Sequence, residues 1–243
     1  MNPPDAQEVD RPPGRTICGL FHNSAARYPH RTALMAKDRA GRYAPMTYRE
    51  LQETVDRLSA ALKGLGMAAG DRAAIYSRNR PEWAMADLAV LRLGGIVVPI
   101  YQTLPPAAVA NILNDSGSKL LFVQDAELWS GLRPAAEECP ALAQVVLLEG
   151  PGNGNRKGEQ TFSGLLVNVP CGDDEKPSPD LPVISPQDPA TIVYTSGTTA
   201  EPKGAVLTHA NIVSNALAAM RRFHFTSDDI IPVSYTHLTL PTN

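Results

Sequence analysis

The residues best suited to chemistry in this sequence lie in one run rich in hydroxyl side chains and glycine. Residues 194–204 read Tyr-Thr-Ser-Gly-Thr-Thr-Ala-Glu-Pro-Lys-Gly. Glycine lets the backbone approach an anion closely, backbone N–H and hydroxyl groups donate hydrogen bonds to it, and Lys203 adds a positive charge. The composition predicts a phosphate-binding loop, and a plain solvated linker is the alternative. The run is not the loop of ordinary kinases and GTPases, because GxxxxGK followed by Ser or Thr is absent.

The elements around this run must hold it in place. Apolar residues predict a strand before it, over residues 190–195, and a second strand after it, over residues 205–208. A helix over about residues 210–222 follows, and Thr208 is its expected N-cap. The run is therefore predicted to connect two strands.

Upstream, helices and short apolar strands alternate. Thr47 and Glu50 form a capping box for an amphipathic helix that stops at Gly66. Strands are predicted over residues 72–77, 96–100, 120–123 and 145–148, with helices over 79–93 (capped by Asn79), after Pro105-Pro106, and over 125–138. This alternation predicts an α/β fold with a mainly parallel sheet covered by helices on both faces. Two Pro/Gly-rich stretches, 150–160 and 170–189, are interpreted as surface connections.

The composition of the chain limits which binding partners and which cellular compartment are expected. The 243 residues carry a formal net charge of −3, and their basic residues form no stripe, so no nucleic-acid partner is expected. Three distant cysteines fit neither a disulfide framework nor a zinc site, which favours a cytoplasmic location. Residues 1–14 are expected to be a disordered lead-in without a secretory signal. The apolar stretch 85–101 contains charged residues and Gly94-Gly95, which argues against a membrane span and leaves peripheral membrane contact open.

The run at 194–204 resembles the signature phosphate loop of the adenylate-forming superfamily, Tyr/Phe-Thr-Ser-Gly-Ser/Thr-Thr-Gly-x-Pro-Lys-Gly. It departs at one specified position, Ala200, where the family has glycine, and a left-handed backbone there would strain alanine by about 1 kcal/mol. Three further segments, 79–83, 94–101 and 114–119, are similar to the front half of long-chain fatty acyl-CoA synthetases. Within these segments we expect Trp83 and Tyr101 to pack in the core, and Arg80 and Glu82 to form a solvated helix start.

The resemblance implies a function. The parent enzyme would activate a long-chain fatty acid or other carboxylate with Mg²⁺ and ATP to give an acyl adenylate, and coenzyme A would then form the thioester. ATP phosphates would be bound by Thr195 at the loop's edge and by Ser196, Gly197, Thr198, Thr199, Lys203 and Gly204. Lys203 is the one residue for which a catalytic role is implied, and no metal-ligating residue is assigned. Fatty acyl-AMP ligases, aryl acid ligases and a non-catalytic nucleotide-binding module remain alternatives.

The resemblance also implies that the chain is incomplete. Residues 15–232 correspond to part of an N-terminal AMP-binding domain, and the C-terminal domain is absent. The tail, 233–243, resembles translated sequencing-adapter read-through, and we expect it to mark an assembly junction. The isolated chain is therefore expected to be inactive and, with an incomplete sheet, prone to aggregation.

Overall fold

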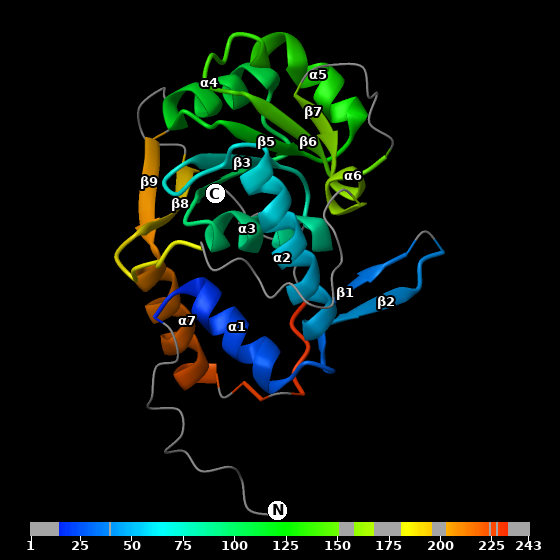
Figure 1. The fold of residues 1–243 in the computed structure, drawn as a ribbon, viewed down its shortest axis with the longest axis vertical. Coiled ribbons are helices and arrows are strands. Elements are labelled where there is room, and N and C mark those ends of the chain that lie inside the picture. The colour runs from blue at the N-terminus through cyan, green and yellow to red at the C-terminus, as the bar shows by residue number, and fades with distance from the viewer. Residues whose placement is uncertain are drawn as a thin grey trace, which may run out of the picture.

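A sheet built from the short apolar runs forms the centre of the protein (Figure 1). The computed structural model describes residues 15–38, 40–150, 158–167, 181–195, 203–223, 225–226 and 228–232. The strands of the sheet are β3 (Arg72–Tyr76), β4 (Ile96–Ile100), β5 (Leu120–Val123), β6 (Gln144–Leu147), β7 (Glu159–Thr161), β8 (Pro189–Thr195) and β9 (Lys203–Thr208). Their order is β7-β6-β5-β3-β4-β8-β9, and every neighbouring pair is parallel except β8 and β9.

Alternate residues of these strands face two separate apolar clusters. On one face, side chains such as Ile75 and Phe122 pack against α2 (Tyr48–Gly64), α3 (Pro81–Arg92) and α6 (Phe162–Val167). On the other face, side chains such as Tyr76 and Leu121 pack against α4 (Pro106–Ser116) and α5 (Ala126–Ala136). Burial on both faces explains why these strands are continuously apolar. The predicted α/β fold, with a mainly parallel sheet covered on both faces, is confirmed.

Helix α2 shows how local sequence sets a boundary. The Thr47 side chain accepts a hydrogen bond from the Glu50 backbone N–H, and the Glu50 carboxylate accepts from the Thr47 backbone N–H. The helix ends before Gly66, whose φ of 89° is left-handed. The predicted capping box and stop are confirmed, and the buried face of the helix consists largely of the periodic residues Leu51, Val55, Leu58 and Leu62.

The start of α3 differs from the prediction. Its N-cap is Arg80 rather than Asn79, and no side chain caps the helix. Pro81 occupies the first helical position, where its fixed φ suits the helix and its missing N–H costs nothing. The residue before a proline is held in extended conformation, and this moves the boundary to Arg80.

Several elements lay outside the sequence prediction. No element was predicted before Thr47, yet α1 (Ile17–Arg27) packs against α2 and α3, and β1 (Thr32–Lys37) and β2 (Tyr43–Thr47) form an antiparallel hairpin. Strand β7 begins inside the stretch 150–160, which was interpreted as a surface connection, and this interpretation was wrong for residues 159–160. Helix α7 (His209–Phe223) lies beside α1 (Figure 1). None of the helices in the described residues combines the length and apolarity that crossing a bilayer requires.

Candidate functional site

The candidate phosphate loop connects the two strands of an antiparallel hairpin. Thr195 is the last residue of β8 and pairs with Lys203, the first residue of β9. The next pair joins Tyr194 to Gly204. Residues 196–202 therefore span the whole connection between Thr195 and Lys203.

Three of the seven predicted phosphate-binding residues lie in the described part of the chain. Thr195, Lys203 and Gly204 are all solvent-exposed and meet at the base of the hairpin. The other four, Ser196, Gly197, Thr198 and Thr199, lie outside the described residues, as does Ala200. A phosphate-binding role for the seven residues thus stays a prediction.

Lys203 is available to an anion. Within the described residues its ammonium group forms no ion pair, although seven ion pairs occur elsewhere in those parts of the chain. An anion bound at the base of the hairpin would therefore meet a positive charge that no carboxylate of the described residues compensates. Electrostatic stabilisation of phosphate oxygens is the chemistry that such a group can supply.

The hairpin is attached to helix α4 by a contact that the sequence did not predict. The hydroxyl of Tyr194 donates a hydrogen bond to Oδ2 of Asp115 at the end of α4, over 2.5 Å. Burial, followed by the hydrogen bond to Asp115 and its negative charge, raises the pKa of Tyr194, so the phenol stays protonated at neutral pH. Tyr194 lies in the run 194–204 and Asp115 in the segment 114–119, both of which carry the family resemblance. The sequence did not indicate that these two residues lie close together.

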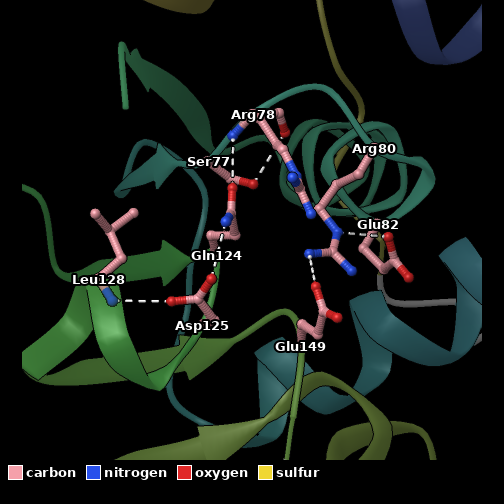
Figure 2. Close-up of polar contacts among 8 residues, drawn as sticks. All are labelled: Ser77, Arg78, Arg80, Glu82, Gln124, Asp125, Leu128 and Glu149. Atoms are coloured by element: carbon pink, nitrogen blue, oxygen red, sulfur yellow. Dashed lines mark hydrogen bonds and ion pairs between the residues drawn. The ribbon is translucent and has the colours of Figure 1, made fainter. Parts of the chain in front are cut away.

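A second polar cluster lies where β3, β5 and β6 end (Figure 2). Arg80 donates from Nε to Glu82 over 2.8 Å and from Nη1 to Glu149 over 2.9 Å. Its side chain is only 14% exposed, so the predicted solvated helix start is wrong for Arg80. Burial follows from the two carboxylates, which compensate the guanidinium charge.

The other half of this cluster caps α5. The backbone N–H of Arg78 donates to the side-chain oxygen of Gln124, and the amide of Gln124 donates to Asp125. Asp125 in turn accepts from the backbone N–H of Leu128 over 2.8 Å (Figure 2). These contacts satisfy backbone groups at the strand ends and helix start, and they explain the cluster as a structural network.

The two aromatic residues that were predicted to pack in the core have different environments. Trp83 packs against the cluster that includes Ile75 and Phe122, as predicted. Tyr101 is 63% exposed, so the prediction is wrong for this residue. It follows directly after β4, where the chain leaves the sheet for the Pro105-Pro106 turn.

The turn after β9 has the structural role that the sequence predicted. The Thr208 hydroxyl accepts from the backbone N–H of Asn211, and the Asn211 side chain accepts from that of Thr208. This reciprocal pair caps α7 and places His209 in the interior, where it is 1% exposed. Within the described residues no group of three His, Cys, Asp or Glu side chains could hold a metal ion.

Comparisons with known proteins agree with this arrangement. The AMP-binding enzyme family matches residues 21–239. Long-chain-fatty-acid--CoA ligase FadD15 of Mycobacterium bovis is 34% identical over 184 residues, which cover 76% of this chain and 30% of that protein. The peroxisomal long chain acyl-CoA synthetase 6 of Arabidopsis thaliana is 35% identical over 204 residues, covering 82% of this chain and 28% of the relative. The chain thus spans about a third of the length of these relatives.

A solved structure extends the comparison to the fold. The anthranilate CoA ligase AuaEII, in complex with anthranoyl-AMP, matches with a TM-score of 0.68 and 26% identity, over 83% of this chain and 36% of that one. The match over nearly the whole sequence, together with the shared fold, shows that this chain belongs to the family of AMP-binding enzymes.

Proposed function

We propose that this chain is the front part of an ATP-dependent acid–thiol ligase that activates a long-chain fatty acid. The observation that carries the proposal is the base of the β8–β9 hairpin, where Lys203 pairs with Thr195 in the strand ladder, is exposed, and has no carboxylate partner among the described residues. Residues 195–199, 203 and 204 bind the β- and γ-phosphates of Mg-ATP. Lys203 stabilises the charge that develops on the leaving pyrophosphate.

The reaction has two steps. The carboxylate of the fatty acid attacks the α-phosphorus of ATP, which forms an acyl adenylate and releases pyrophosphate. The thiol of coenzyme A then attacks the acyl carbonyl and displaces AMP. In the complete protein, residues 15–232 form part of the AMP-binding domain and a later domain completes the site. We place the enzyme in the cytoplasm, with contact to membranes through its lipid substrate.

The choice of a fatty acid rests on the two relatives at 34% and 35% identity, whose names state long-chain substrates. An aryl acid is the second candidate because the matched structure at 26% identity is an anthranilate CoA ligase. A panel of palmitate, benzoate and anthranilate separates the two. We expect palmitate to support the fastest pyrophosphate release by the complete protein, and faster release with either aryl acid would contradict the proposed substrate.

Coenzyme A tests the second step. We expect palmitoyl-CoA to accumulate when coenzyme A is added, whereas accumulation of acyl adenylate alone would indicate a fatty acyl-AMP ligase. The isolated chain 1–243 is expected to form no thioester. Absence of carboxylate-dependent pyrophosphate release by the complete protein would favour a non-catalytic nucleotide-binding module.

A further inference from the structure

Tyr194 and Asp115 connect the candidate site to the end of helix α4. They are 79 residues apart, and the hydroxyl of Tyr194 donates to Oδ2 of Asp115 over 2.5 Å. Within the described residues the Asp115 side chain makes no other hydrogen bond or ion pair, although it is exposed.

The other side of the Tyr194 ring lies against β9. A Cβ added at Gly204 would approach Cζ of Tyr194 to 3.0 Å, Cε1 to 3.2 Å and Cγ2 of Ile192 to 2.8 Å. Only glycine leaves room for the ring at this separation. Tyr194 is thus fixed at its ring by the backbone of β9 and at its hydroxyl by the end of α4.

This double contact lies one residue from the pair that begins and ends the candidate loop. Tyr194 precedes Thr195, and Gly204 follows Lys203, so the two pairs are consecutive in the β8–β9 ladder. A displacement of the Tyr194 ring would move both strands at the point where Lys203 leaves the ladder.

We propose that Asp115 is a positioning residue, which holds the Tyr194 hydroxyl and so fixes the base of the β8–β9 hairpin and the direction of Lys203. The role of Lys203 in this inference rests on the proposed function. The loop pattern of the superfamily accepts either tyrosine or phenylalanine at position 194, and only tyrosine can donate this hydrogen bond.

The first experiment measures the contact without any substrate. Hydrogen exchange is followed for the backbone amides of residues 191–195 and 203–206 in the wild type and in Asp115→Ala, Asp115→Asn and Asn114→Ala. We expect exchange to be about tenfold faster in Asp115→Ala and close to wild type in Asp115→Asn, whose side-chain oxygen still accepts. Asn114→Ala, an exposed neighbour on α4, is the matched control and should change nothing. Equal exchange in Asp115→Ala and Asn114→Ala would overturn the proposal.

The second experiment measures the consequence for Lys203. We expect Asp115→Ala and Tyr194→Phe each to lower kcat for carboxylate-dependent ATP–pyrophosphate exchange in the complete protein about tenfold, with little change in KM for the carboxylate. The double variant should be no slower than either single one, because both changes remove the same contact. Asp115→Asn should restore the rate. Additive losses or no rescue would contradict a positioning role. If the wild type shows no exchange activity, the proposed function fails and hydrogen exchange alone decides the inference.

Discussion

The backbone N–H of Ile17 donates a hydrogen bond to Nδ1 of His209 over 3.4 Å and so joins the first helix to the last across 192 residues of sequence. The acceptor must be an unprotonated nitrogen, so His209 is neutral with its proton on Nε2. Burial lowers the pKa of His209 more than nearby Asp188 raises it, in agreement with this assignment. The hydrogen bond holds the first residue of α1 against the first residue of α7.

Replacement of His209 should therefore weaken the protein. We expect His209→Ala to lower the free energy of unfolding by about 3 kcal/mol, since it empties a buried position and leaves the N–H of Ile17 without its partner. Chemical denaturation checks this. The exposed His30→Ala is the matched control and should stay within about 0.5 kcal/mol of wild type. Equal stability of His209→Ala and His30→Ala would contradict the structural role of His209.

The same residue predicts a dependence on pH. Because folding lowers the pKa of His209, the unfolded chain binds the proton more readily. The contribution of His209 to stability is fully present above the ordinary histidine pKa of 6.5. It is lost as the pH falls through the lower pKa that His209 has in the folded state. Unfolding curves from pH 8 to pH 5 should show a smaller loss in His209→Ala than in the wild type. Parallel curves would contradict this assignment.

Asp87 predicts the opposite dependence. It lies on α3 within electrostatic reach of Cys18 on α1, and burial raises its pKa from 3.8 to about 7. Because the pKa of Asp87 is higher in the folded state than in the unfolded state, the contribution of Asp87 to stability is fully present below the unfolded-state pKa. That contribution is lost as the pH rises through about 7. Asp87→Asn should be more stable than wild type at pH 8, by about 2 kcal/mol, with little difference at pH 4. Exposed Glu127→Gln is the control, and an equal pH response in both would refute the prediction.

Variants of Arg80 measure how much its polar cluster contributes to the free energy of unfolding. Arg80→Ala removes hydrogen bonds to Glu82 and Glu149 and should cost about 2 kcal/mol, reduced from the buried limit because both carboxylates are partly exposed. Arg80→Lys should recover only part of this, because an ammonium does not reproduce the planar fork. Arg78→Ala, whose side chain is exposed, is the control. A loss of the same size in Arg78→Ala would show that general charge, and not these contacts, determines the effect.

Gly95 tests the packing between α3 and β4. A Cβ at this position would lie 2.5 Å from Cε of Met67, 2.9 Å from Cγ1 of Val90 and 3.0 Å from the backbone oxygen of Val90. The backbone oxygen cannot move without shifting α3, so Gly95→Ala should destabilise the protein by about 2 kcal/mol. Gly131→Ala in α5 meets nothing within 4 Å and should stabilise by about 0.5 kcal/mol. Thermal unfolding of the two variants should shift in opposite directions.

The elements that the sequence predicted best are those with local causes. Residues 96–100 and 120–123 form strands at the predicted bounds because each is an apolar run between turn residues. The helix after Thr47 follows from a capping box that spans four residues, Thr47 to Glu50. Lys203 was identified because glycine, hydroxyl and lysine residues lie together in one segment.

The relationships that the sequence did not predict are those between distant segments. No local pattern shows that Asp115 receives the Tyr194 hydroxyl or that Ile17 reaches His209. Arg80 looked solvated because the carboxylate that buries it, Glu149, is 69 residues away. Such contacts depend on strand order and crossover direction, which periodicity within a segment does not specify.

Carboxylate-dependent ATP–pyrophosphate exchange by the complete protein, with palmitate, tests the central claim most directly. The measurement compares wild type with Lys203→Ala and with Lys63→Ala, an exposed lysine at the end of α2. We expect exchange in the wild type, a loss on the order of 100-fold in Lys203→Ala at unchanged thermal stability, and wild-type rates in Lys63→Ala. Unchanged exchange in Lys203→Ala, or no palmitate-dependent exchange in the wild type, would contradict the account.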